Sequence, residues 1–171
     1  MRIIKSLCLS FLCIFSVTAY ADNSVAVDFV KSFYIDLQKA EADTSLGRIQ
    51  KLKDYFEPGL YQLLVNDDDN RAKNKDHMCG FVAFDVFGNF REDVNANVKA
   101  ELVPSDTSTQ VAVTLPDTKT PALTMQLKNE KGKWKISNIV YPTDTMGPDG
   151  LIGKLQQTQK VNCPKEVEAE E

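Results

Sequence analysis

The chain has 171 residues, of which 43% are hydrophobic and 26% are charged, a composition typical of a folded globular protein and not of a disordered or membrane-spanning one. Its length suffices for one compact domain and is short for two. Because the formal net charge is −4, nucleic acid and anionic lipid are poor candidates for a partner, since both repel an acidic surface.

The N-terminal segment has the features of an export signal. Arg2 and Lys5 form a positive start, an apolar stretch covers residues 7–17, and Ala19 and Ala21 supply the small side chains that signal peptidase requires. The stretch is too short to span a bilayer comfortably, so we expect cleavage after Ala21 and no membrane insertion afterwards. An uncleaved N-terminal anchor is the alternative. The expected location is the periplasm or the cell exterior.

Export changes how the cysteines are interpreted. Cys8 and Cys13 leave with the signal, so the mature chain keeps Cys79 and Cys163. An even pair in an oxidising compartment predicts one disulfide, which would close a long loop and stabilise the fold by roughly 4–5 kcal/mol. A reactive thiol or half of a metal site is the alternative, but neither cysteine has the C-x-x-C spacing of such sites.

The next part of the chain has apolar side chains at the three- and four-residue spacing of amphipathic helices. We expect helices over about 24–40, with Asn23 or Ser24 as N-cap, over 46–56, and from Pro58 onward. The third helix loses its apolar face at the polar run Asn66-Asp67-Asp68-Asp69-Asn70. From there to Asp76 the chain is expected to be solvated.

From residue 94 onward the apolar period changes from 3.6 to 2, which indicates strands with one buried face. Four strands are expected, at 94–102, 111–115, 123–127 and 134–141, and the short turns between them make neighbours antiparallel, as in a meander. The residues assigned to the buried face are Val94, Ala96, Val98, Ala100, Leu102, Val111, Val113, Leu115, Leu123, Met125 and Leu127.

The last strand does not keep a single phase. Ile139 and Tyr141 are out of phase with Trp134 and Ile136, which allows a slip of one residue there. We expect Trp134 to be buried against the helical layer, near the first helix.

Helices followed by an antiparallel meander predict an α+β domain, with N-terminal helices packed on a curved four-stranded sheet. A short last helix is expected over about 151–159. The expected organisation is a cleaved signal peptide at 1–21, a single domain at 22–163, and a disordered acidic tail at 164–171.

Three stretches resemble a known superfamily. They are Val27-Asp28-Phe29-Val30-Lys31-Ser32-Phe33-Tyr34, Phe84-Asp85-Val86-Phe87 and Trp134-Lys135-Ile136-Ser137-Asn138-Ile139. Over roughly residues 24–157 the chain resembles the cystatin-like, or nuclear-transport-factor-like, superfamily, and within it a family of exported bacterial domains. The resemblance implies a cone-shaped fold. It does not choose an activity, because the superfamily includes enzymes, binding modules and toxin-neutralising proteins.

The chain has one histidine, His77, beside Asp76 and close to Cys79. A general base or a metal ligand at this position would need partners, and the chain has no second histidine. We therefore interpret His77 as a solvated loop residue.

The acidic run at 67–70 was compared with a calcium-binding loop. It lacks the glycine and the twelfth-position glutamate of an EF-hand, so we expect no metal. Asp67, Asp68 and Asp69 are interpreted as an acidic patch that faces a partner, or as a helix end frayed by charge repulsion.

Phe81, Phe84, Phe87 and Phe90 recur at every third residue, with Asp85 among them. We interpret the rings as filling the mouth of the cone, and Asp85 as capping a turn. The alternative is a small-molecule cavity lined by these rings, with Asp85 as a catalytic carboxylate of raised pKa.

The buried strand faces carry no charged residue, and acid–base catalysis needs a positioned titratable pair. We therefore expect a non-catalytic periplasmic domain that binds another protein and uses no cofactor. One specific role is that of an immunity protein or inhibitor that neutralises a toxic effector. The expected partner is a basic toxin or an envelope component, because opposite charge speeds encounter. The alternatives are an accessory subunit of an envelope complex, a small-ligand carrier, and an isomerase- or hydrolase-like enzyme using Asp85 and His77.

Overall fold

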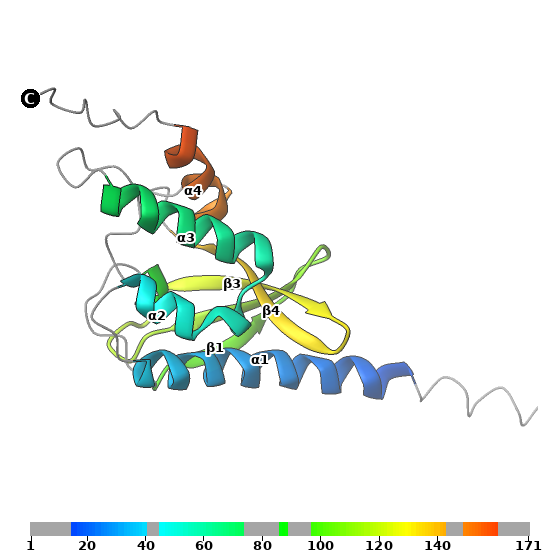
Figure 1. Ribbon diagram of the computed structural model, residues 1–171. Helices are drawn as coiled ribbons and strands as arrows, with labels where there is room; N and C mark the ends of the chain where they lie inside the picture. Colours follow the sequence, from blue (N-terminus) through cyan, green and yellow to red (C-terminus); the bar gives the residue numbers. More distant parts are fainter. Residues whose placement is uncertain (1–14, 41–44, 74–85, 89–96, 143–148, 161–171) are drawn as a thin grey trace, which may run out of the picture.

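The computed structural model describes residues 15–40, 45–73, 86–88, 97–142 and 149–160, which form an α+β arrangement of helices and one antiparallel sheet (Figure 1). The elements, in chain order, are α1 (Phe15–Lys39), α2 (Ser45–Lys51), the 3-10 turn η1 (Lys53–Tyr55), α3 (Pro58–Lys73), the 3-10 turn η3 (Val86–Gly88), β1 (Lys99–Val103), β2 (Thr109–Thr114), β3 (Leu123–Glu130), β4 (Lys133–Val140) and α4 (Gly150–Lys160).

The four strands lie in the order β1-β2-β3-β4, and each pair is antiparallel, so the predicted meander is confirmed. The prediction of the buried face is confirmed for the residues of β2 and β3 and for Val98, Ala100 and Leu115. It is wrong for Leu102, which is 36% exposed because it lies near the end of an edge strand. Val94 and Ala96 lie outside the described residues.

The phase shift predicted in the last strand is confirmed as a β-bulge. Gln126 pairs with Asn138 and Leu127 pairs with Ile136, which leaves Ser137 as the extra residue of β4. The Ser137 hydroxyl donates a hydrogen bond to the Gln126 carbonyl over 3.0 Å. Because of this extra residue, both Ile136 and Ile139 face the core and are fully buried.

Two helices differ from their expected bounds. α1 begins at Phe15, earlier than the expected start near residue 24, so Asn23 and Ser24 lie inside the helix instead of capping it. The segment before them contains Ala19 and Ala21 and has no glycine or proline to end a helix. The second expected helix divides into α2 and η1. α4 closely matches the predicted last helix.

The sequence predicted that the third helix loses its apolar face at the acidic run. In the structure, α3 continues through this run to Lys73. α4 packs against α3, and Asp67 and Asp68 are only 1% and 8% exposed. The expectation that the chain is solvated from this run to Asp76 is therefore wrong for Asp67 and Asp68, because a helix far along the chain covers that face of α3, and residues 74–76 lie outside the described residues.

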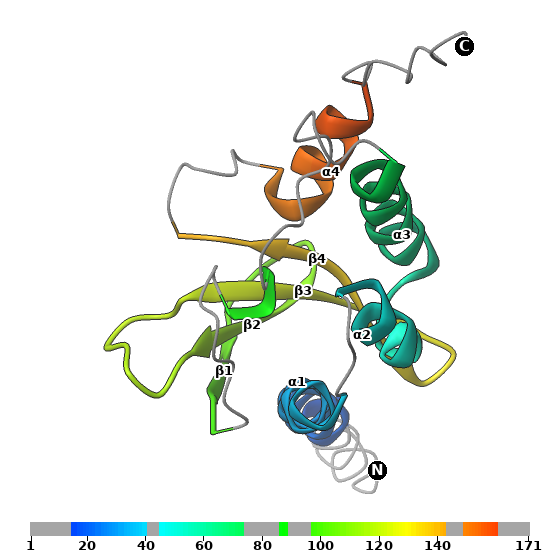
Figure 2. The same cartoon turned by 60° about the vertical axis from the view of Figure 1, so that its left-hand side comes forward.

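The helices contact the sheet at two places. α1 contacts β1 and β2, whereas α3, α4 and η1 contact β4. Figure 2 shows α2 and α3 on the same side of the strands. The Glu57 amide donates a 2.9 Å hydrogen bond to the Ile136 carbonyl, so the chain after η1 runs beside the edge of β4. Within the ranges given above, no helix is long and apolar enough to cross a membrane.

Aromatic rings form the centre of the core. The Phe33 ring lies edge-on to Tyr55, Phe56 and Phe87, with ring centroids 5.3, 5.9 and 5.1 Å away. These contacts join α1, η1 and η3. Trp134, in contrast, is only partly buried and packs at the margin of the core, so its predicted burial is met only in part.

Candidate functional site

Most residues of the predicted cavity and the predicted disulfide lie outside the described part of the chain. They are Cys79, Cys163, Phe81, Phe84 and Asp85, and His77 and Phe90 lie outside it too. The disulfide and the cavity therefore stay predictions.

Phe87 is the one member of the predicted aromatic set that the structure describes. It is 4% exposed, and its ring stacks on Phe56 with centroids 5.7 Å apart. The hydroxyl of Tyr34 donates to the Phe87 carbonyl over 2.7 Å, and the hydroxyl of Tyr141 donates to the Val86 carbonyl over the same distance. Phe87 thus fills the core, and two buried tyrosines hold its turn in place.

The predicted acidic patch is not formed as expected. Asp67 accepts a 3.1 Å hydrogen bond from the Thr158 hydroxyl of α4, and Asp68 binds Arg71 with 2.5 Å between Oδ1 and Nη2. Of the three aspartates, only Asp69 is exposed. A partner therefore cannot meet three free carboxylates here, because two of them already serve contacts within the fold.

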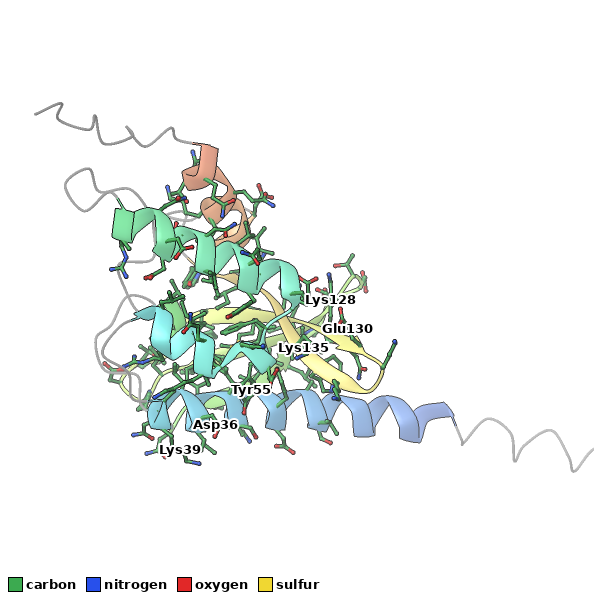
Figure 3. All side chains as sticks on the ribbon, viewed as in Figure 1. Asp36, Lys39, Tyr55, Lys128, Glu130 and Lys135 are labelled. Atoms are coloured by element: carbon green, nitrogen blue, oxygen red, sulfur yellow. The ribbon has the colours of Figure 1, made fainter. Side chains whose placement is uncertain are left out.

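A tyrosine–carboxylate pair joins η1 to α1, and the sequence analysis missed it. The Tyr55 hydroxyl donates to Asp36 Oδ2 over 2.6 Å, and the Lys39 Nζ lies 3.7 Å from Asp36 Oδ1 (Figure 3). Burial, together with the hydrogen bond and charge of Asp36, raises the pKa of Tyr55 well above its ordinary value. The phenol therefore stays protonated and acts as a hydrogen-bond donor, not as a base. No local pattern connects residues this far apart in sequence.

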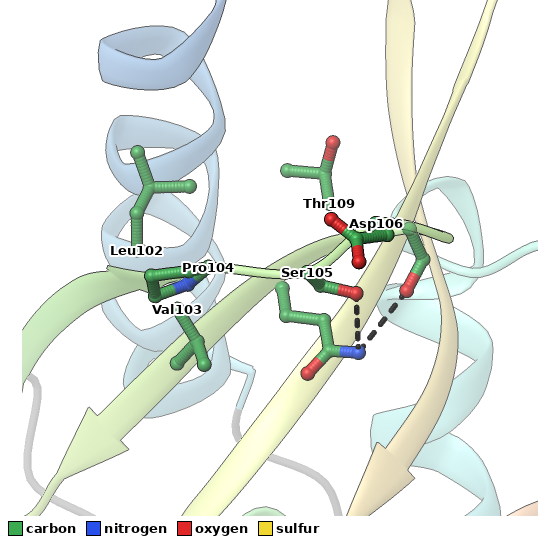
Figure 4. A pocket seen from close by; sticks show the side chains of 8 residues that line it. Leu102, Val103, Pro104, Ser105, Asp106 and Thr109 are labelled. Carbon is green, nitrogen blue, oxygen red and sulfur yellow. Dashed lines mark hydrogen bonds between the residues drawn. The ribbon is translucent and has the colours of Figure 1, made fainter.

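A hollow of about 540 Å³ lies beside the β1–β2 hairpin (Figure 4). Its lining comprises Leu102, Val103, Pro104, Ser105, Asp106, Ser108, Thr109 and Gln110. The amide nitrogen of Gln110 donates to the hydroxyls of Ser105 and Ser108, each over 3.2 Å. These polar groups bind one another across the β1–β2 turn. The hollow is therefore a feature of the hairpin turn, and these hydrogen bonds serve the turn itself. Elsewhere in the described ranges, no cluster of three or more His, Cys, Asp or Glu side chains is placed to hold a metal.

The outward side of the sheet presents regular rows of side chains, of which Glu101 is exposed, Ala112 is only 9% exposed and the others are half-buried. One cross-strand row runs from Glu101 through Ala112 and Thr124 to Val140, and Gln110 pairs with Gln126 in the next row. We call these six residues the open face. Their side chains alternate with the buried Val111, Val113, Leu123 and Met125 and therefore point away from the helices.

Comparisons with known protein families, with curated protein sequences and with solved structures each find no match.

Proposed function

We propose that this protein is a non-catalytic, exported domain that binds another protein through the open face of its sheet. The observation that carries the proposal is the contrast between the two sides of the sheet. The inner side is filled by packed apolar residues, whereas the outer side of β2 and β3 carries Gln110, Thr124 and Gln126, which are half-buried.

The side chains of the open face suit a binding role. Thr124 and Val140 are β-branched and half-buried, so they lose little rotamer freedom when a partner covers them, whereas Ala112 is already buried at 9% exposure. The backbone beneath them is held by hydrogen-bonded strands on both sides in β2 and β3. A rigid surface of this kind binds at a low entropic cost. The amide of Gln126 adds hydrogen-bonding groups for specificity, whereas the amide nitrogen of Gln110 already donates to Ser105 and Ser108.

The more specific forms of the proposal come from the sequence. An exported domain braced by a Cys79–Cys163 disulfide fits an immunity protein or inhibitor that neutralises a toxic effector in the periplasm, and it fits an accessory subunit of an envelope complex equally well. The order of elements, helices first and then a four-stranded antiparallel meander, supports the finer assignment to a cone-shaped, cystatin-like fold.

One pair of variants tests the open face. Thr124→Arg places a long charged side chain at the centre of it, and Ser32→Arg makes the same addition on an exposed position of α1. The immobilised proteins are incubated with periplasmic extract, the protein that wild type retains is identified by mass spectrometry, and its affinity is then measured with purified partner. We expect Thr124→Arg to weaken binding about tenfold or more, since central interface positions cost more than 1 kcal/mol.

Ser32→Arg is expected to bind the partner like wild type, and both variants should melt as wild type does. Equal affinity of the two variants would contradict the open face as the binding surface. Failure of the wild-type protein to retain any protein reproducibly would contradict the binding role itself.

A further inference from the structure

The β3–β4 hairpin concentrates positive charge in an acidic protein. Lys128, Lys131, Lys133 and Lys135 lie within eight residues that contain one acidic side chain, Glu130, so the hairpin carries a net charge of +3, whereas the whole chain carries −4. We call these four lysines the basic tip. Three of them are exposed and Lys135 is partly buried.

Two of these lysines face each other across the strands. Lys128 of β3 pairs with Lys135 of β4, on the outward side of the sheet. Like charges directly opposite one another destabilise a sheet. Among the described residues the relief is weak, because the Lys128 Nζ lies 4.0 Å from Glu57 Oε1 and Lys135 donates to the uncharged carbonyl of Asp54. The pair therefore lowers the stability of the hairpin.

The turn of the hairpin carries a second cost. Lys131 and Gly132 have φ values of +55° and +83°, as in a two-residue type I′ turn, and the Asn129 side chain accepts a 2.9 Å hydrogen bond from the Gly132 amide. The first position of such a turn favours Asn, Asp or Gly, because a longer side chain is strained at positive φ. Here a lysine occupies it. Two independent structural costs therefore fall on three of the four lysines of the basic tip, Lys128, Lys131 and Lys135.

We propose that the basic tip is a docking site for an acidic segment of the partner protein. This inference rests on the proposed function, because it assigns a charge to the partner that the open face binds. Lys128 and Lys135 have the same strand parity as Gln126, so their stems leave the sheet on the side of the open face, and their amino groups reach Glu57 and the Asp54 carbonyl beside β4. The tip projects past α2 and α3 in Figure 1, and Figure 3 shows Lys128 and Lys135 at that end.

An acidic protein segment fits the basic tip better than an extended anionic surface. A bilayer or a polyanion would repel the rest of this chain, whose net charge is negative, whereas a short carboxylate-rich segment meets only the tip. Lysines on flexible stems are point charges that suit carboxylates at variable positions, unlike the fixed fork of arginine. The proposal thus gives the partner a local acidic stretch and not the basic surface expected from the sequence.

The test uses a fluorescein-labelled hexaglutamate peptide as the probe, with binding followed by fluorescence anisotropy. The tip variant carries Lys128→Gln, Lys131→Gln and Lys133→Gln, and the control carries Lys31→Gln, Lys99→Gln and Lys119→Gln. Both variants change the net charge by the same amount, at exposed lysines of different elements. We expect the tip variant to bind about tenfold more weakly than wild type and the control to stay within about twofold. Wild-type binding should weaken strongly between about 0.1 M and 1 M salt, as the screening length falls from about 10 Å to about 3 Å.

A single substitution separates a binding role from a structural one. Lys131→Asn places the favoured residue in the turn, so it should raise the melting temperature while it lowers the affinity for the peptide. If Lys131 served the fold alone, peptide affinity would stay unchanged.

Equal losses in the two triple variants would overturn the proposal. Lysine-dependent binding to vesicles of phosphatidylglycerol and phosphatidylcholine, without binding to the peptide, would replace the acidic segment with a lipid surface. The outcomes for the two surfaces can be told apart. If Thr124→Arg loses partner capture and the tip variant keeps it, the open face is supported and the basic tip is refuted. If the tip binds the peptide and Thr124→Arg captures the partner normally, the basic tip is supported and the open face is refuted.

Discussion

At the scale of single residues, the two buried tyrosine hydroxyls offer the sharpest test of the core. Tyr34→Phe and Tyr141→Phe each remove a 2.7 Å hydrogen bond to a carbonyl of η3 while keeping the ring. A buried carbonyl that loses its donor is desolvated without compensation, so each variant should lower the free energy of unfolding by about 1–3 kcal/mol. Urea denaturation measures the change. Tyr61→Phe, at a partly exposed ring on α3, is the control and should change the free energy of unfolding little. Similar losses of stability at all three positions would show that the two buried hydrogen bonds contribute no more than an exposed hydroxyl does.

At the scale of elements, α4 depends on one side chain of β4. The Asn138 Oδ1 accepts a 3.1 Å hydrogen bond from the Ile152 amide in the first turn of α4, and its Nδ2 donates to the Asp149 carbonyl over 3.0 Å. Asn138 thus caps a helix from a neighbouring strand. Gly150 makes the close approach feasible, because its φ is +63° and an added Cβ would lie 2.4 Å from the Ile139 carbonyl oxygen.

Asn138→Ala should therefore cost about 1 kcal/mol, the usual value for losing an N-cap, and should loosen α4 from the sheet. Hydrogen exchange at the α4 amides, together with the urea midpoint, checks this. Asn138→Asp keeps the accepting oxygen at the positive end of the helix but loses the Nδ2 bond to the Asp149 carbonyl, so it should retain part of the stability. The docking role of Asn138 would be wrong if both variants protected the α4 amides as wild type does.

At the scale of the whole molecule, Phe33 connects α1, η1 and η3 in one core, which predicts a single cooperative unfolding transition. The chain contains one tryptophan, Trp134 at the hairpin end of β4, so its fluorescence reports the sheet while far-UV circular dichroism reports mainly the helices. The two urea curves should coincide. Phe33→Leu should shift both together, by about 1–3 kcal/mol, and Ile35→Ala, at a position 43% exposed, should shift neither. A shift in one probe alone would indicate two separately folding parts.

Much of the sheet followed from the sequence by itself, because the determining signals are local. Alternating side chains in β2 and β3 identify the buried face, short turns force antiparallel neighbours, and the change of phase between Ile136 and Ile139 marks the bulge. The lysines of the basic tip are also visible in the sequence as a run around Gly132, within a chain whose net charge is −4.

Tertiary structure alone decided the burial of the acidic run and the pairing of Tyr55 with Asp36. Asp67 is covered by Thr158 of α4. The residue pattern of α3 alone cannot predict a contact with a helix so distant in the chain. Leu102 shows the opposite case, since strand alternation predicts burial but cannot tell an edge strand from a central one. The physical reason is the same in each case: hydrophobic pattern reports which face a residue occupies, whereas burial and charge partners depend on what other elements place against that face.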